Sequence, residues 1–308
     1  MSLVTISDLY NQPNDIVAKY LSWASDLGDI YENFIKQDDE DVAYITGWHG
    51  AKSRSQGIHA SEMSGGCRRP VWYSITGVAR QDGDLDPFWK KRFRIGHAYH
   101  AMIQEDWRRI SEKSGGLMSF EKEVRIDPSL QLIAAEYDIH SSCDGVIIFR
   151  DKPWGEAVLR VGLEIKTASP KQFEELKKPK LEHDRQTCVY MKCLDVPVLW
   201  TMYVNKGNQN VIPSKPPYLF TFDYNLWNVI EGETKEVIHL ATINEIPERS
   251  ESIVCQFCGY AWTCKPACLE QKAKREHAKQ QRAVMQKRLK QVGTGGIRVP
   301  RVIAAGDE

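Results

Sequence analysis

No stretch of this 308-residue sequence approaches the roughly 18–20 consecutive apolar residues of a membrane-spanning helix, so we expect no membrane contact. Neither sign of charge is in excess, because 41 Lys and Arg balance 41 Asp and Glu. This excludes a strongly basic, histone-like protein. The N-terminus lacks a basic stretch followed by an apolar core, so we expect no secretory signal. The expected location is therefore the cytoplasm.

The sequence contains eight cysteines, which do not indicate a disulfide framework because no export signal is expected. Cys255, Cys258 and Cys264 follow a C-x2-C-x5-C spacing, which is typical of a metal or cluster site. Three thiolates need a fourth ligand. Cys268 is the nearest candidate and would complete a zinc knuckle, whereas Cys67 would join the N-terminal part of the chain to the C-terminal part.

Charge is unevenly distributed although it sums to zero. Residues 1–50 hold nine acidic and two basic residues, whereas residues 270–301 hold ten basic and two acidic ones. A basic C-terminal segment suits a polyanionic partner, but a solvated helix with a loose tail explains it equally well. Apolar residues at alternating spacings of four and three predict a helix over residues 14–36. That helix either packs on its own domain or binds a protein partner, and a homo-oligomer also stays open.

Helices precede and follow a central group of expected strands. The patterns predict further helices over residues 59–76, 87–111, 172–194 and 225–243. They predict strands over residues 120–127, 143–149, 159–167, 197–205 and 218–223. This order indicates an α/β or α+β core with a mixed sheet.

The central strands carry a candidate acidic site. Glu164 and Lys166 are two residues apart in an expected strand, so their side chains share one face. Asp144 opens the preceding apolar strand and can lie near Glu164. Two carboxylates suit Mg²⁺ or Mn²⁺, and a neighbouring lysine can orient a water molecule or neutralise charge on a phosphate. A surface ion pair is the simpler interpretation of these residues alone.

Two expected helices add further candidates. His100 follows Gly96 by four residues, and a neutral imidazole is a good ligand for Mn²⁺. A single helical histidine is more often structural than a ligand. Gln186 and Tyr190 are four residues apart and share a helical face, where an amide and a phenol can hydrogen-bond a phosphate and stack on a base.

The joint order and spacing of these motifs resemble the RecB-like branch of the PD-(D/E)xK nucleases over about residues 58–268. Within it, the sequence is similar to the cluster-bearing exonucleases related to the CRISPR-associated Cas-four family and to the AddB nuclease domain. The residues that carry the resemblance are Cys67, Gly96, His100, Asp144, Glu164, Lys166, Gln186, Tyr190, Cys255, Cys258 and Cys264. One departure is Cys143, which occupies a position before the motif aspartate that can hold proline in the family.

The resemblance implies an α/β, restriction-endonuclease-like core with a central mixed sheet flanked by helices, plus a helical N-terminal extension and a cysteine-rich segment. It implies a divalent ion, Mg²⁺ or Mn²⁺, and a [4Fe-4S] cluster, with Zn²⁺ as the alternative at the cysteines. The implied metal ligands are His100, Asp144, Glu164 and the carbonyl of Ile165, with Lys166 assisting the attacking water. The implied cluster ligands are Cys67, Cys255, Cys258 and Cys264, which leaves Cys268 spare. Gln186 and Tyr190 would contact DNA or support the site.

The expected organisation is a helical extension over residues 1–57, a nuclease core over 58–269 and a basic helix with a tail over 270–308. The expected function is metal-dependent exonucleolytic cleavage of DNA, acting on single strands or free ends in recombination, repair or phage- and CRISPR-related processing. The alternative is a non-catalytic DNA-binding or adaptor protein with a nuclease-like fold and a structural metal site.

Overall fold

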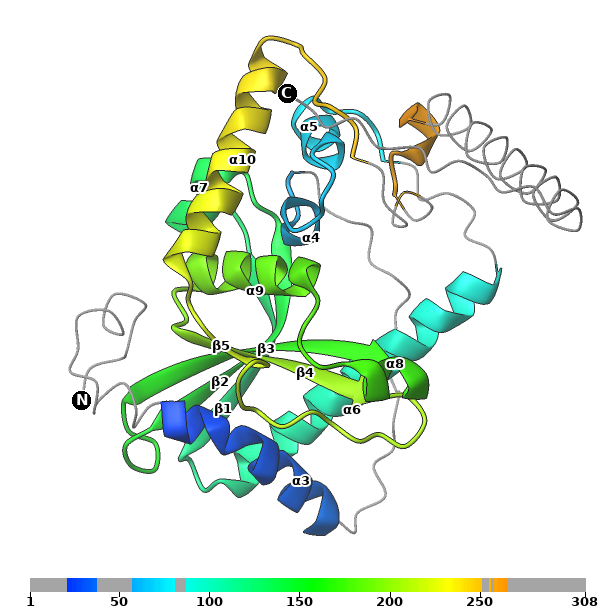
Figure 1. The fold of residues 1–308 in the computed structure, drawn as a ribbon. Helices are drawn as coiled ribbons and strands as arrows, with labels where there is room; N and C mark the ends of the chain where they lie inside the picture. The colour runs from blue at the N-terminus through cyan, green and yellow to red at the C-terminus, as the bar shows by residue number, and fades with distance from the viewer. Residues whose placement is uncertain (1–20, 38–56, 81–86, 251–254, 256–257, 265–308) are drawn as a thin grey trace, which may run out of the picture.

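The computed structural model describes residues 21–37, 57–80, 87–250, 255 and 258–264. Its helices are α3 (Leu27–Gln37), α4 (Ala60–Met63), α5 (Arg69–Ile75), α6 (Pro87–Lys113), α7 (Leu132–Tyr137), α8 (Pro170–Glu175), α9 (Leu181–Leu194) and α10 (Tyr224–Thr242). Its strands are β1 (Met118–Ile126), β2 (Ser141–Arg150), β3 (Ala157–Ala168), β4 (Val198–Asn205) and β5 (Leu219–Thr221). Figure 1 shows these elements along the chain.

The five strands form one mixed sheet in the order β1-β2-β3-β4-β5. β1, β2 and β3 are antiparallel neighbours, β4 lies parallel to β3, and β5 returns antiparallel to β4. The parallel step requires a crossover, which α8 and α9 provide between β3 and β4. β3 therefore lies in the middle of the sheet, and all eight residues of β4 are buried.

Helices cover both faces of this sheet (Figure 1). One face packs against α3 and α6, around the fully buried rings of Trp107 and Trp200. The other face packs against α9, and α4 and α10 pack on α9 from outside, with α5 beside α4 and α10. The predicted α/β class, a mixed sheet flanked by helices, is confirmed and is consistent with a restriction-endonuclease-like core.

The predicted helix over residues 14–36 is confirmed from residue 21 onward but is interrupted at Asp26, before α3 begins. The buried Ser214 hydroxyl lies at this interruption. It accepts a hydrogen bond from the Gly28 N–H (2.7 Å) and donates one to the Ser25 carbonyl (2.8 Å). A side chain from far along the chain thus satisfies backbone groups that a continuous helix would pair internally.

Two predicted helices are each divided in the structure. Residues 59–76 form α4 and α5 on either side of a turn that contains Gly65 and Gly66. Residues 172–194 form α8 and α9 around Pro179, because proline disfavours a helical conformation in the residue before it. The short helix α7 was not predicted.

Several expected features lie outside the described residues, namely residues 14–20, Cys268 and the basic segment 270–301. Among the described residues, no helix combines the length and apolarity needed to cross a membrane.

Candidate active site and cysteine pocket

The candidate acidic residues Asp144 and Glu164 lie at the end of the pairing between β2 and β3. β2 and β3 pair as far as Gly145 and Leu163, so Asp144 and Glu164 come directly after the last pair. The helix α6 brings His100 to this point from one face of the sheet, and α9 brings Gln186 and Tyr190 from the other (Figure 1). The structure therefore brings together side chains from four elements: α6, β2, β3 and α9.

Asp144 joins helix α6 to strand β3 through its carboxylate. One oxygen lies 3.1 Å from Nδ1 of His100, and the other accepts a hydrogen bond of 2.6 Å from the main-chain N–H of Ile165. The side chain of Asp144 is only 14% exposed. Its position is therefore defined by a helix on one side and a neighbouring strand on the other.

A second chain of contacts runs from Glu164 into α9. The Lys166 ammonium group donates to a carboxylate oxygen of Glu164 (2.6 Å) and to the side-chain carbonyl of Gln186 (3.0 Å). The amide nitrogen of Gln186 in turn donates to the hydroxyl of Tyr190 (2.6 Å). The ammonium group of Lys166 thus has two acceptors: Glu164 in the same strand and Gln186 in α9. Gln186 and Tyr190 are the predicted i, i+4 pair.

Burial and mutual repulsion give the two carboxyl groups different acidities. Burial, followed by the charge of Asp144, raises the pKa of Glu164 to about 7. Burial also acts on Asp144, but His100, the Ile165 N–H and Lys166 hold its pKa below the ordinary value. For the cations, the carboxylates outweigh burial, so the pKa values of His100 and Lys166 are raised. Two buried carboxylates in close proximity favour an additional positive charge between them.

The donor set suits a hard divalent ion. Carboxylate oxygens prefer Mg²⁺ and Mn²⁺, and a histidine that ligates through one ring nitrogen commonly donates the other N–H to a carboxylate. The His100–Asp144 contact at Nδ1 leaves Nε2 for that role. In the described ranges, however, no three His, Cys, Asp or Glu side chains are already arranged to share one ion. Binding by His100, Asp144 and Glu164 therefore requires their side chains to reorient, with Lys166 giving up part of its contact with Glu164.

Two contact residues of this site were not identified from the sequence. Gln104, one helical turn after His100, donates to the main-chain carbonyl of Asp144 (2.8 Å) and to the carboxylate of Glu123 (2.9 Å). The i+4 spacing from His100 was a signal for Gln104. Nothing in the local sequence pattern indicates Glu123. Gly96 faces β3, where a methyl group in its place would meet Thr167 at an ordinary contact distance of 3.6 Å.

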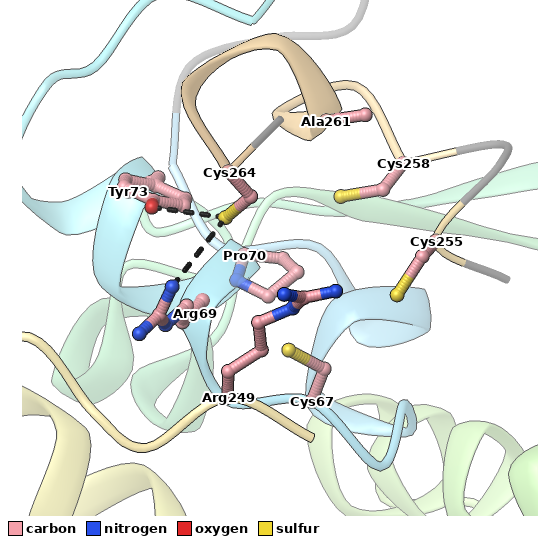
Figure 2. A pocket seen from close by; sticks show the side chains of 9 residues that line it. All are labelled: Cys67, Arg69, Pro70, Tyr73, Arg249, Cys255, Cys258, Ala261 and Cys264. Atoms are coloured by element: carbon pink, nitrogen blue, oxygen red, sulfur yellow. Dashed lines mark hydrogen bonds between the residues drawn. The ribbon is translucent and has the colours of Figure 1, made fainter. Parts of the chain in front are cut away.

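A second candidate site is a pocket lined by Cys67, Cys255, Cys258 and Cys264 (Figure 2). Cys67 lies just before α5, whereas the other three lie near the end of the described chain. Figure 2 shows the Arg249 guanidinium reaching toward the same space as the sulfur atoms. The structure thus brings together in one pocket the four cysteines that the resemblance implies, although no three described thiols are already arranged to share a single metal ion.

Polar groups contact the thiol of Cys264. The Tyr73 hydroxyl lies 3.1 Å from the sulfur, and the Arg69 guanidinium lies 3.9 Å away (Figure 2). Burial, together with the contact with Cys264, raises the pKa of Tyr73 to about 12. Burial also raises the pKa of Cys258, and the nearby thiols of Cys264, Cys67 and Cys255 add to this shift. Arginine cations beside several thiols are a favourable setting for thiolate ligands.

Tyr260 anchors the cysteine segment to the N-terminal helices. Its ring is buried and lies 5.2 Å from the ring of Tyr73, and its hydroxyl pairs with the Ser74 hydroxyl (2.8 Å). Arg80 lies over the same ring at 5.8 Å and forms an ion pair of 2.8 Å with the buried Glu62. Ordinary protein contacts thus hold residues 258–264 against α4 and α5.

No known protein family matches the sequence, and no curated protein is significantly similar to it. Among solved structures, the crystal structure of SSO0001 aligns with 76% of this chain and 93% of its own, at 12% identity and a TM-score of 0.36. The structure of LHK-Exo in complex with dAMP aligns with 61% of this chain and 89% of its own, at 15% identity and a TM-score of 0.40. The alkaline exonuclease LHK-Exo from Laribacter hongkongensis aligns with 62% and 90%, at 13% identity and a TM-score of 0.36. Scores below 0.5 do not identify a shared function.

Proposed function

We propose that this protein is a divalent-metal-dependent nuclease that hydrolyses phosphodiester bonds in DNA. The observation that carries the proposal is the convergence of His100, Asp144, Glu164 and Lys166 at one end of the β2–β3 ladder. The residues come from three elements, and each largely buried carboxylate pairs with a cationic group, Asp144 with His100 and Glu164 with Lys166. A buried carboxylate pair is costly to fold, which favours a functional role over a structural one.

His100, Asp144 and Glu164, with the Ile165 carbonyl, would hold the ion. When bound, Mg²⁺ or Mn²⁺ supplies a Lewis acid that lowers the pKa of a coordinated water and polarises the scissile phosphate. Asp144 is the carboxylate that stays ionised, because His100 and the Ile165 N–H favour its charged form. Burial raises the pKa of Glu164 to about 7, and the positive charge of a bound ion would favour its ionised form.

Lys166 is the group that acts on the reacting atoms. Its ammonium group has three donors, of which Glu164 and Gln186 take two. The third can orient the attacking water or neutralise the charge that develops on the phosphate. Gln186 fixes the direction in which the ammonium group points, because it accepts from Lys166 while its own amide nitrogen donates to Tyr190.

The finer assignment, an exonuclease acting on single strands or free ends, follows from the sequence resemblance rather than from the geometry. The same holds for a role in recombination, repair or phage- and CRISPR-related processing. The division into a helical extension (1–57), a nuclease core (58–269) and a basic tail (270–308) is part of the same proposal.

We also propose that Cys67, Cys255, Cys258 and Cys264 ligate a [4Fe-4S] cluster, with Zn²⁺ as the competing occupant. The shared pocket supports four-cysteine ligation, and the arginine cations beside it offset the negative charge of the thiolates. The role would be structural, because the four ligands join a segment before the core to a segment after it.

The nuclease proposal is tested by incubating the full chain with 5′-labelled and 3′-labelled single-stranded and duplex DNA, with Mg²⁺, Mn²⁺ or EDTA. We expect metal-dependent shortening from an end, and none from Asp144→Asn, which keeps the shape of the side chain. Tight DNA binding without cleavage in any metal would instead support the non-catalytic alternative.

The cluster proposal is tested by purifying the protein without oxygen and measuring iron, sulfide and zinc per chain. A brown protein with about four irons supports the cluster, and Cys258→Ser should bleach it and lower the folding yield. A colourless protein with about one zinc would overturn the iron assignment.

A further inference from the structure

Gln104 connects the helix that carries His100 to the strand that carries Asp144. It lies one turn after His100 in α6 and is 7% exposed. Its amide nitrogen has two N–H donors, and both are used: one for the main-chain carbonyl of Asp144 (2.8 Å) and one for a carboxylate oxygen of Glu123 (2.9 Å). A single buried amide therefore ties α6 to both β1 and β2.

Asp144 lies at a gap in both of its ladders. On the β1 side, Lys122 pairs with Gly145 and Val124 pairs with Cys143, so the intervening pair of Glu123 and Asp144 is missing. On the β3 side, the ladder ends at Gly145 and Leu163. The main chain of Asp144 is thus not fixed by regular strand pairing at its own position. Gln104 supplies the hydrogen bond to its carbonyl.

Glu123 has an unusual backbone at this gap. Its φ of 51° is in the left-handed region, which residues other than glycine rarely adopt. Such outliers cost free energy and are concentrated at functional sites. The Glu123 carboxylate accepts from Gln104 and lies 3.4 Å from the hydroxyl of Ser142. Although exposed, its side chain is therefore directed to the residues around Asp144.

We propose that Gln104 and Glu123 are a positioning pair that fixes Asp144 relative to His100 and thereby sets the divalent-metal affinity of the site. This inference depends on the proposed metal site. Glu123 orients the Gln104 amide, and Gln104 holds the Asp144 carbonyl at the point where the sheet does not. Neither residue is proposed as a metal ligand.

The test is the Mn²⁺ dissociation constant of the full chain, measured from the electron paramagnetic resonance signal of free Mn²⁺. Gln104→Leu should weaken binding by about tenfold or more, as loss of a partner behind the ligands does in other metal sites. Gln131→Leu is a matched control, because Gln131 also bonds main-chain groups at Arg125 and Asp127, but at the end of β1. It should lower the melting temperature without changing Mn²⁺ affinity.

Glu123 is exposed, so its substitution provides a second test if Gln104→Leu does not fold. Glu123→Ala should weaken Mn²⁺ binding. Glu123→Gln should retain Mn²⁺ affinity, because an amide oxygen still accepts from Gln104. The double variant Gln104→Leu/Glu123→Ala should bind Mn²⁺ no more weakly than Gln104→Leu alone, because the two residues act as one pair. Affinities within about twofold of wild type for both Gln104→Leu and Glu123→Ala would overturn the pair. If Asp144→Asn also bound Mn²⁺ normally, the proposed metal site itself would fail together with the pair.

Discussion

The side chains of the candidate site differ in what each can do because their surroundings differ. Asp144 and Glu164 are both buried carboxylates, but Asp144 has a main-chain N–H and an imidazole beside it, whereas Glu164 has mainly Lys166. The pKa of Asp144 is therefore lowered and that of Glu164 raised. Such divergence between adjacent acids is typical of catalytic sites.

Gln186 should affect the rate of DNA cleavage because it positions the ammonium group of Lys166. Gln186→Leu removes the acceptor that holds the ammonium group and should slow metal-dependent cleavage by about tenfold or more, because misplaced catalytic groups lose rate steeply. The measurement is a single-turnover cleavage rate at saturating DNA. Glu182→Gln, on the exposed side of the same helix, serves as the control. An unchanged rate for Gln186→Leu would show that Lys166 needs no support from α9.

His183 should make the folded state sensitive to acid. Burial, with the charges of Lys166 and Lys180, lowers its pKa from 6.5 to about 3, and its ring bonds the Tyr203 hydroxyl. Because the unfolded chain takes up the proton first, this contribution to stability is present above about pH 6.5. It is lost progressively as the pH falls toward the folded pKa.

The corresponding measurement is the free energy of unfolding in urea at pH 7 and pH 5. Between these values His183 should account for a loss of about 2 kcal/mol, and His183→Gln should lose correspondingly less. Equal losses for wild type and His183→Gln would contradict the neutral, buried histidine.

The helix α3 depends on a residue outside the helix. Ser214→Ala leaves the Gly28 N–H and the Ser25 carbonyl without the hydroxyl that bridges them, and should destabilise the protein by about 1–3 kcal/mol. Thr242→Ala removes a hydroxyl at the exposed end of α10 and should change stability little. Urea unfolding of both variants measures the difference. Equal stability of the two would mean that water replaces Ser214 at no cost.

Element type was predictable from the sequence, but element interruptions were only partly so. The apolar runs of β2, β3 and β4 and the amphipathic pattern of α10 place these elements within a few residues. The gap at Glu123 and the interruption before α3 were not predictable, because each depends on a partner distant in the chain, Gln104 or Ser214. Gly65–Gly66 and Pro179 are local signals of a helix interruption, but the helical periodicity of the surrounding residues outweighed them in the prediction.

Across the whole molecule, the two ends of the core meet at Tyr260. In protein freed of metal and cluster, Tyr260→Ala should release the cysteine segment from α5 and raise the rate of Cys258 alkylation by about tenfold, because half-buried thiols then reach solvent. Trp262→Ala removes an aromatic ring from the same segment that is already 43% exposed, and should leave the rate unchanged. Alkylation is followed by mass spectrometry of the peptide. Equal rates for both variants would show that Tyr260 does not anchor the segment.

The candidate sites follow from the sequence because their residues occur as short motifs on separate elements, and the fold brings the motifs together. Glu164-x-Lys166 and Gln186-x3-Tyr190 meet at Lys166, and Cys67 meets the C-terminal cysteines 188 or more residues away. The spacing of motifs does not specify which atoms touch. The His100–Asp144 bond and the Lys166–Glu164 pair therefore emerge only from the structure.

The most direct test of the central claim is the single-turnover cleavage of end-labelled DNA in Mn²⁺ by wild type and by Glu164→Gln, with melting temperatures measured alongside. Glu164→Gln keeps the volume of the buried side chain but removes the charge to which the proposal assigns metal binding. The account predicts a loss of about 10²–10³ in rate with the fold retained. Cleavage at the wild-type rate by folded Glu164→Gln would contradict a metal site built on this carboxylate.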